Sequence, residues 1–252
     1  MAEIQLHRDG SVLIVTIANE SKYNAFTHAM TSTLGSAFRD AEDDESIRCV
    51  IVTGAGRKAF SSGHDLSELL QNRELAANEA LNEPFYMPQL MTKPVIAAVN
   101  GVAHAGGLIL ALSCDIRICE PAADFAAPGA RIGLLPIGGQ ISRLPGLIPH
   151  GVAYEMLATA RRVSADEAHR LGFVNHVAEP GQLMGMALAT AKQIAANSPA
   201  VLAMIKKGLK LRAAEGERAA SQFEWEEGGR LQCGPDADEG VRAFLEKRVP
   251  KF

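Results

Sequence analysis

The chain is poor in aromatic residues and cysteine, and it has no long hydrophobic run. Aromatic side chains make up 5% of its 252 residues, and the four cysteines are Cys49, Cys114, Cys119 and Cys233. None of the cysteines has the paired spacing of a zinc site, so we expect reduced thiols and no bound metal. The longest apolar run, around residues 105–114, is far shorter than the roughly 20 residues that a membrane-spanning helix needs.

An excess of positive charge is missing as well. The formal net charge is -4, so no basic field invites nucleic acid or an anionic membrane. The first ten residues, MAEIQLHRDG, have neither the basic flank nor the apolar centre of a secretory signal. We therefore expect a cytoplasmic protein without a nucleic-acid partner, and its length fits one large domain or a domain with an appendage.

Strand and helix patterns alternate in the first part of the chain. A hairpin is expected around Asp9-Gly10, and residues 28–44 carry apolar side chains at helical spacing. The stretch GGLILALS indicates a short buried helix that starts on glycines. Continuous apolar runs that predict buried strands lie at 47–54, 94–101 and 115–120.

Two further regions have different textures. Residues 71–84 are charged, polar and without a clean period, which predicts a mobile, partly helical excursion over the surface and a candidate lid. From about residue 150 amphipathic helical patterns dominate, and Ser164 and Ser198-Pro199 have the chemistry of helix starts. The order is therefore strand-loop-helix units followed by a helical appendage.

A dinucleotide-binding pattern occurs after one strand but lacks its context. Gly54, Gly56 and Ala59 match G-x-G-x-x-A, yet the next residues are FSSGHD rather than the start of a helix. A pyrophosphate site needs the free amides of a helix that begins at once. We interpret these glycines as a tight turn that leaves a buried strand.

Two other glycine-bearing turns offer unpaired backbone amides. Gly63-His64-Asp65 leads into the helical stretch LSELL, and Gly106-Gly107 begins GGLILALS. If both turns face one cleft, their N–H groups form an oxyanion hole for an enolate or a tetrahedral intermediate. From the residues alone, an oxyanion hole and two ordinary tight turns are equally good interpretations.

The motifs KAFSSGHDL and NGVAHAGGLILALSCDI, with their spacing, resemble the enoyl-CoA hydratase/isomerase (crotonase) family. The similarity continues in ESKYNAF, GLLPIGGQISRLPGLIP, SADEAHRLGFVNHV and GVRAFLEKRVPKF, so it covers essentially the whole chain. It implies an α/β fold, a crotonase-type spiral of ββα units with two roughly perpendicular sheet layers and a helical C-terminal trimerisation region. We place the spiral core at 1–195 and the helical region at 196–252, and expect a homotrimer or a dimer of trimers.

The resemblance also assigns chemistry to the two turns. It implies acyl-CoA thioester substrates whose carbonyl oxygen accepts hydrogen bonds from the amides of His64 and Gly106. In this reading His64 acts through its main chain, while the alternative is that its ring polarises a substrate group. Coenzyme A is then part of the substrate, and no separate cofactor is expected.

Both glutamates of the family's hydratases are replaced here. Their positions correspond to Ile109 and Gly129, neither of which can move a proton, so efficient hydration is not expected. We considered other residues near these positions as substitutes and found no convincing acid–base pair: His104, Asp115, Arg131, Ile137, Gln140 and Ser142. His104 is more typical of a hydrogen-bonded core residue, Asp115 of a buried structural acid at a strand start, and Arg131 returns to the same face only if its segment is a strand.

The nucleotide-contact positions of the family carry over better. The resemblance places a cation for the coenzyme A phosphates at Lys22, the adenine pocket at Ala25, and the thioester arm beside Ser62, Asp65 and Leu66. Lys247 resembles a C-terminal cation that reaches the nucleotide of a neighbouring subunit, although both lysines also fit a solvated surface. The function expected is an acyl-CoA enzyme that works through an enolate, as a hydratase, decarboxylase or isomerase. A non-catalytic acyl-CoA-binding or regulatory protein is the alternative.

Overall fold

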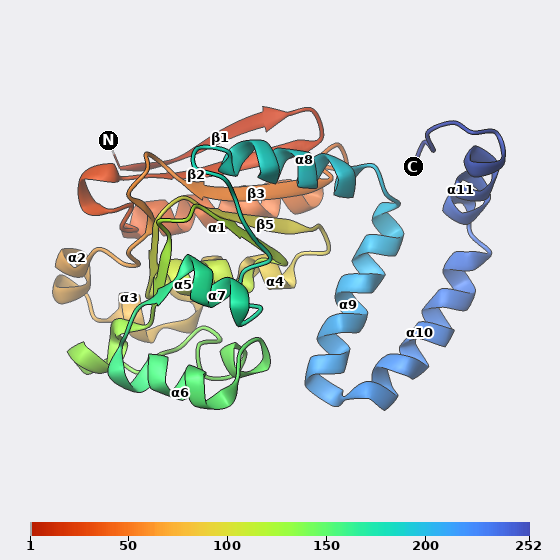
Figure 1. Ribbon diagram of the computed structural model, residues 1–252. Helices are drawn as coiled ribbons and strands as arrows, with labels where there is room; N and C mark the ends of the chain where they lie inside the picture. Colours follow the sequence, from red (N-terminus) through yellow and green to blue (C-terminus); the bar gives the residue numbers. More distant parts are fainter. Residues whose placement is uncertain (1) are drawn as a thin grey trace.

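Residues 2–252, which the computed structural model describes, form two β-sheets and surrounding helices (Figure 1). The larger sheet has the order β1-β2-β3-β5-β7-β10, and the smaller has the order β4-β6-β8-β9. The larger sheet comprises β1 (Glu3–Asp9), β2 (Val12–Ala18), β3 (Cys49–Gly54), β5 (Val95–Val99), β7 (Ile116–Cys119) and β10 (His176–Val177). The smaller sheet comprises β4 (Ala59–Ser61), β6 (Val102–His104), β8 (Asp124–Ala126) and β9 (Val163–Ser164).

The chain alternates between the two sheets as it advances. β3, β5 and β7 pair in parallel in the larger sheet, and β4, β6 and β8, which follow them in turn, pair in parallel in the smaller sheet. Helices α2 (Leu66–Gln71), α3 (Glu74–Ala77) and α4 (Glu79–Leu90) follow β4, and α5 (Gly106–Ser113) follows β6. This repetition confirms the predicted α/β spiral of ββα units.

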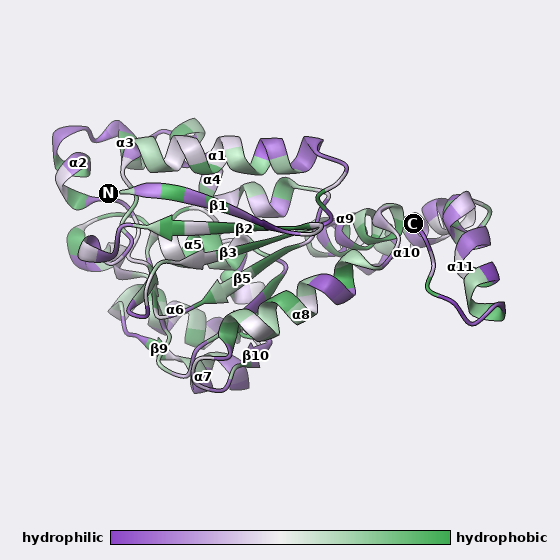
Figure 2. Cartoon of the chain, turned by 90° about the horizontal axis from the view of Figure 1, so that it is seen from above, coloured by the Kyte–Doolittle hydropathy of each residue, from purple (hydrophilic) through white to green (hydrophobic). Residues whose placement is uncertain are grey.

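The larger sheet is covered on both faces, as its continuous apolar strands predict. Because strand side chains alternate, Val50 and Val52 face the main core, while Ile51 faces a second cluster beneath α8 (Leu183–Ala195). Figure 2 shows the hydrophobic strands between α8 on one side and α1 (His28–Asp43) with α4 on the other. All eight residues of α5 are buried, so this helix lies within the core.

The prediction of a surface excursion over residues 71–84 is wrong where α4 begins. Asn82 and Phe85 are buried, and α4 packs against α1 and α5. The polar residues of the segment and the two prolines inside α4, Pro84 and Pro88, hide the helical period in the sequence. From residue 81 onward the segment therefore forms a wall of the core beside α5, whereas residues 71–80 are mostly exposed, as predicted.

Helices dominate the remainder of the chain. Ser164 caps α7, accepting from the amide of Glu167, and Ser198 caps α9, accepting from the amide of Val201, as their sequence signals predict. Helices α9–α11 stand apart from the two sheets (Figure 1), while the boundary at residue 195 stays a prediction. The further helices are α6 (His150–Thr159), α7 (Ala165–Arg170), α9 (Pro199–Glu215), α10 (Glu217–Gln232) and α11 (Pro235–Leu245), with 3₁₀ turns η1 (Glu20–Lys22), η2 (Pro128–Ile132) and η3 (Leu144–Gly146).

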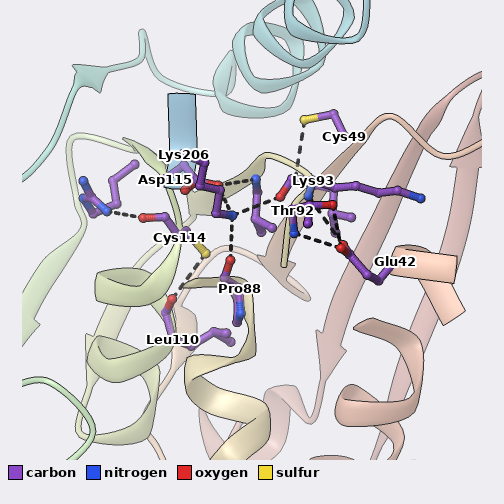
Figure 3. Close-up of polar contacts among 12 residues, drawn as sticks. Glu42, Cys49, Pro88, Thr92, Lys93, Leu110, Cys114, Asp115 and Lys206 are labelled. Carbon is purple, nitrogen blue, oxygen red and sulfur yellow. Dashed lines mark hydrogen bonds and ion pairs between the residues drawn. The ribbon is translucent and has the colours of Figure 1, made fainter. Parts of the chain in front are cut away.

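A buried lysine ties α9 to the core (Figure 3). Lys206 Nζ donates to Asp115 Oδ2 at 2.7 Å, to the Pro88 carbonyl at 2.7 Å and to the Lys93 carbonyl at 3.0 Å. The same Asp115 oxygen accepts from the amide of Val95 at 2.8 Å. Asp115 therefore joins the starts of β5 and β7 to α9, the structural role that its position predicts, although it is exposed and not buried as expected.

Candidate active site

The two glycine-bearing turns meet at the start of α5. Gly63 has φ +96°, and a Cβ built on it would lie 2.8 Å from the amide nitrogen of Gly106 and 2.9 Å from Cβ of Ala105. A Cβ on Gly107 would lie 2.2 Å from the carbonyl oxygen of Ser61. Side chains at Gly63 and Gly107 would therefore force the turn and the helix apart.

Two amides at this junction have no acceptor within residues 2–252. The amide of Phe26 donates to the Gly63 carbonyl, and that of Asp65 donates to the Phe26 carbonyl, so the pairing passes over the amide of His64. Gly106 is the first residue of α5, and its N–H is one of the amides that a helix leaves unpaired. His64 and Gly106 therefore supply two free donors beside one another.

The backbone at Ala105 is strained. This non-glycine residue has φ 47° and ψ -116°, and its amide donates to the Ala126 carbonyl at 3.1 Å. Such a conformation costs on the order of 1–3 kcal/mol and persists where the surroundings enforce it. Here it turns the chain from β6 into α5 and sets the direction of the Gly106 amide.

The ring of His64 is held by α4. His64 Nε2 lies 2.9 Å from Oδ1 of Asn82, and the ring meets Phe85 edge to face at 4.9 Å between centroids. Burial lowers the pKa of His64 below the ordinary value of 6.5, and the Asn82 hydrogen bond opposes part of that shift. The ring is therefore neutral near pH 7.

Four of the six positions assigned to coenzyme A come together around η1. The Ser62 hydroxyl donates to the Lys22 carbonyl at 3.3 Å, and Lys22 Nζ binds Asp65 Oδ2 at 2.5 Å. Ala25 is buried beside these contacts, immediately before the residue that pairs with His64. Asp65 also caps α2 through the amide of Ser67.

Leu66 and Lys247 differ from these four. Leu66 is largely exposed at the first turn of α2. Lys247 follows α11, which lies far from α2 in both views (Figures 1 and 2), so it does not join the other positions within one chain. The roles assigned to all six residues stay predictions.

The two positions where the family's hydratases carry glutamate are both crowded. Ile109 is buried in α5, and a Cβ on Gly138 would lie 2.7 Å from its Cγ2 atom. A Cβ on Gly129 would lie 2.6 Å from the carbonyl oxygen of Leu134, whose amide in turn donates to the Gly129 carbonyl. A side chain at position 129 therefore requires the Leu134 carbonyl to move, and a side chain at position 109 is buried against Gly138.

The substitutes considered from the sequence are engaged elsewhere or exposed. His104 binds Asp124, which also pairs with Arg162 at 3.4 Å. Arg131 lies in the 3₁₀ turn η2, so the assumption that a strand returns it to the face of position 129 is wrong, and it donates to the Thr159 carbonyl. The Gln140 side chain donates to the Ile137 carbonyl, while Ile137 and Ser142 are exposed.

Sequence reasoning missed Asn82 and Glu68. Asn82 lies in the segment interpreted as surface, and nothing local marks it as a partner of His64. Glu68 lies four residues after His64, and its Oε2 accepts from the amide of His28 at 2.7 Å. Glu68 adjoins a small cavity of about 10 Å³ beside His64, which is lined by Phe26, His28, Thr31, His64, Asp65, Glu68, Leu75 and Leu81.

Within residues 2–252 there is no group of three or more side chains placed to bind a metal, and no helix long and apolar enough to cross a membrane. The turn after β3 leads into β4 and not into a helix. This agrees with the interpretation of the G-x-G-x-x-A match as a tight turn rather than a dinucleotide site. Cys49, Cys114 and Cys119 are buried in the core, where the sequence places them.

Comparisons with known proteins find relatives in both sequence and fold. Residues 7–252 match the family model described as enoyl-CoA hydratase/isomerase. The chain is 38% identical to carnitinyl-CoA dehydratase of Salmonella typhi over 98% of this chain and 97% of that protein. It is 35% identical to short-chain-enoyl-CoA hydratase of Clostridium acetobutylicum over 96% and 94%. The crystal structure of enoyl-CoA hydratase from Bacillus anthracis superposes with a TM-score of 0.94 at 30% identity, covering 99% of this chain and 98% of that one.

Proposed function

Because the chain belongs to the enoyl-CoA hydratase/isomerase family, we propose that it binds short acyl-CoA thioesters and stabilises their enolates. The thioester oxygen accepts from the amides of His64 and Gly106. The relatives named for carnitinyl-CoA and short-chain-enoyl-CoA support small acyl groups as the substrate class.

The observation that carries this proposal is the pair of free amides held side by side. Their spacing depends on the contact of Gly63 with Gly106 and on the strained backbone of Ala105. Preorganised donors of this kind stabilise negative charge as it develops on a carbonyl oxygen, without reorganising during the reaction. An ordinary tight turn needs neither the strain nor the unpaired amides.

The coenzyme A portion lies along η1 and the start of α2. Lys22 has a half-exposed side chain that can exchange its contact with Asp65 for a phosphate. Neighbouring subunits cover α9–α11, because these helices expose large apolar side chains such as Leu209, Trp225 and Phe244. We expect a homotrimer or a dimer of trimers, and sedimentation as a monomer at micromolar concentration would contradict this assembly.

The reaction differs from efficient hydration. Addition of water needs one group to deprotonate the water and another to protonate the α-carbon, and positions 109 and 129 supply neither. Isomerisation or decarboxylation through the same enolate is compatible with the site. The specific observation that favours a non-catalytic acyl-CoA-binding protein instead is that position 129 is closed by the Leu134 carbonyl, while position 109 is filled by a buried isoleucine.

Calorimetry and turnover separate these alternatives. Butyryl-CoA should bind more tightly than coenzyme A alone, since only the thioester places an oxygen between the two amides. Failure of several acyl-CoAs to bind at millimolar concentration would end the proposal. Binding with turnover of a 3-enoyl or malonyl-type thioester identifies an enzyme, while binding without turnover across the panel identifies a binding protein.

A further inference from the structure

We propose that the ring of His64 carries the α-proton during enolate formation, with Asn82 as its positioning residue. This inference rests on the proposed function and deepens it. It assigns a proton carrier to a site in which Ile109 and Gly129 leave no acid or base.

The hydrogen bonds of Asn82 fix the tautomer of His64. The Asn82 side-chain nitrogen donates to the Leu75 carbonyl at 3.1 Å and to the Asn78 carbonyl at 2.9 Å. An amide nitrogen has two hydrogens and both are committed, so Oδ1 must face the ring and accept from it. His64 Nε2 therefore carries the hydrogen, and the neutral ring keeps a lone pair on Nδ1.

The free lone pair belongs to the same residue as the free amide. Nδ1 is bonded to Cγ, the ring atom that carries Cβ, so it is the ring nitrogen nearer the main chain. It has no hydrogen-bond partner within residues 2–252. A carbonyl oxygen bound to the His64 amide has its α-carbon one bond beyond the carbonyl carbon. The oxyanion donor and the base thus belong to one residue, with the backbone nitrogen and Nδ1 separated by four covalent bonds.

Charged and polar groups from the packed elements surround the ring. Glu68 lies on α2 and Asp65 caps that helix, while His28 and Thr31 lie on α1, around the same small cavity. Its volume of about 10 Å³ is the room that one water molecule needs. The Glu68 charge favours the imidazolium that forms when Nδ1 takes a proton, while Asp65 is already neutralised by Lys22.

The step balances without a co-reactant. The α-carbon–hydrogen bond breaks, the proton moves to Nδ1, and the electron pair becomes the enolate whose oxygen is held by the two amides. Return of a proton from Nδ1 to the α-carbon restores the thioester. In deuterium oxide the cycle replaces the α-hydrogen with deuterium, because the imidazolium exchanges with solvent.

Exchange at the α-carbon of butyryl-CoA, followed by NMR in deuterium oxide, measures this step directly. His64→Gln should reduce the exchange rate by about 10²-fold or more, with unchanged butyryl-CoA affinity, because Gln keeps the backbone amide. His28→Gln is the matched control, since that ring borders the same cavity without a contact to the hole, and its exchange rate should be unchanged. Circular dichroism and affinity show whether each variant is folded.

Two substitutions at Asn82 should shift the pH profile in opposite directions. The exchange rate rises with pH as the ring loses its proton. Asn82→Asp places a carboxylate on Nε2, raises the pKa of His64 and moves the midpoint to higher pH, whereas Asn82→Leu removes the hydrogen bond and moves it lower. Asn82→Gln, which keeps an amide, should exchange the α-hydrogen faster than Asn82→Leu and so recover part of the wild-type exchange rate. A merely structural role of Asn82 does not predict this recovery.

Outcomes of the two proposals are distinguishable. If wild type binds butyryl-CoA but shows no exchange, or if His64→Gln keeps the wild-type rate, the assignment of the ring is overturned and the binding function survives. The same holds if His28→Gln lowers the rate as much as His64→Gln. Absence of binding in folded wild-type protein overturns the proposed function itself.

Discussion

Gly63 lies against Gly106 so closely that a Cβ on the first would come within 2.8 Å of the backbone nitrogen of the second. The contact explains why the chain keeps glycine at this position, which has φ +96° and lies between β4 and α2. The contact also means that the position of the His64 amide depends on the position of the Gly106 amide. Disturbing one turn should therefore disturb both donors.

Gly63→Ala should weaken acyl-CoA turnover or α-hydrogen exchange by about 10²–10³-fold, the loss typical of one oxyanion donor. The new methyl group would push the Gly106 amide away from the carbonyl oxygen. Gly10→Ala is the matched control, because Gly10 also has positive φ but nothing within 4 Å of its built Cβ. Equal losses of activity in the two variants would show that backbone strain, and not the hole, is responsible.

Features that are local in the sequence were predictable. The helix at GGLILALS and the strands at 47–54, 94–101 and 115–120 depend on continuous apolar runs, and the structure confirms them as α5, β3, β5 and β7. The caps at Ser164 and Ser198 depend on contacts three residues away. Family motifs then supplied the connectivity of the sheets.

Contacts across the fold were not predictable in the same way. The helix α4 contains Pro84 and Pro88 and many polar residues, and its burial depends on α1 and α5, which close around it. Asn82 meets His64 only after α4 has docked. Single-sequence patterns carry no signal for such a pair, because both residues lie in segments without apolar periodicity.

Lys206→Met should lower the free energy of unfolding by about 1–3 kcal/mol, the cost of leaving buried acceptors without their hydrogen-bond donor. Asp115 and the Pro88 and Lys93 carbonyls would lose a shared donor. Urea denaturation provides the measurement, with Lys207→Met as control, since Lys207 is exposed and lies over the Phe223 ring.

Adding Asp115→Asn to Lys206→Met should recover part of the loss, because the amide no longer leaves a charge unpaired. Additive effects of the two substitutions would contradict an ion pair that matters for stability. An unchanged midpoint in Lys206→Met alone would contradict the role of Lys206 in tying α9 to the core.

Lys22→Met should raise the pKa of Asp65, which is lowered to about 2 chiefly by its hydrogen bond from Lys22 and then by Ser67. A depressed pKa in the folded state stabilises the fold above the unfolded value near 3.8, and that contribution is lost as the pH falls toward 2. The variant should therefore lose less stability than wild type between pH 4 and 2. NMR titration of the Asp65 carboxyl and acid unfolding provide the measurements, and parallel curves for the two proteins would contradict the assignment.

Hydration of a short 2-enoyl-CoA should be very weak in the wild-type protein, since Ile109 and Gly129 replace both carboxylates. The test is to restore them. Ile109→Glu with Gly129→Glu should add more hydration than the sum of the single changes, because the two acids act on one water. The oxyanion hole is made of backbone and should persist in all variants.

The structure sets the cost of that restoration. A side chain at position 129 must move the Leu134 carbonyl, which lies 2.6 Å from the built Cβ, and a carboxylate at position 109 is buried beside Gly138. The control is Ile109→Gln with Gly129→Ala, which imposes similar strain and polar burial without an acid. Both double variants should lose stability in urea, but only the glutamate pair should gain turnover. A wild-type kcat on the order of 10² s⁻¹ for hydration would show instead that a group other than two carboxylates activates the water, and His64→Gln and His104→Gln would then identify which ring does so.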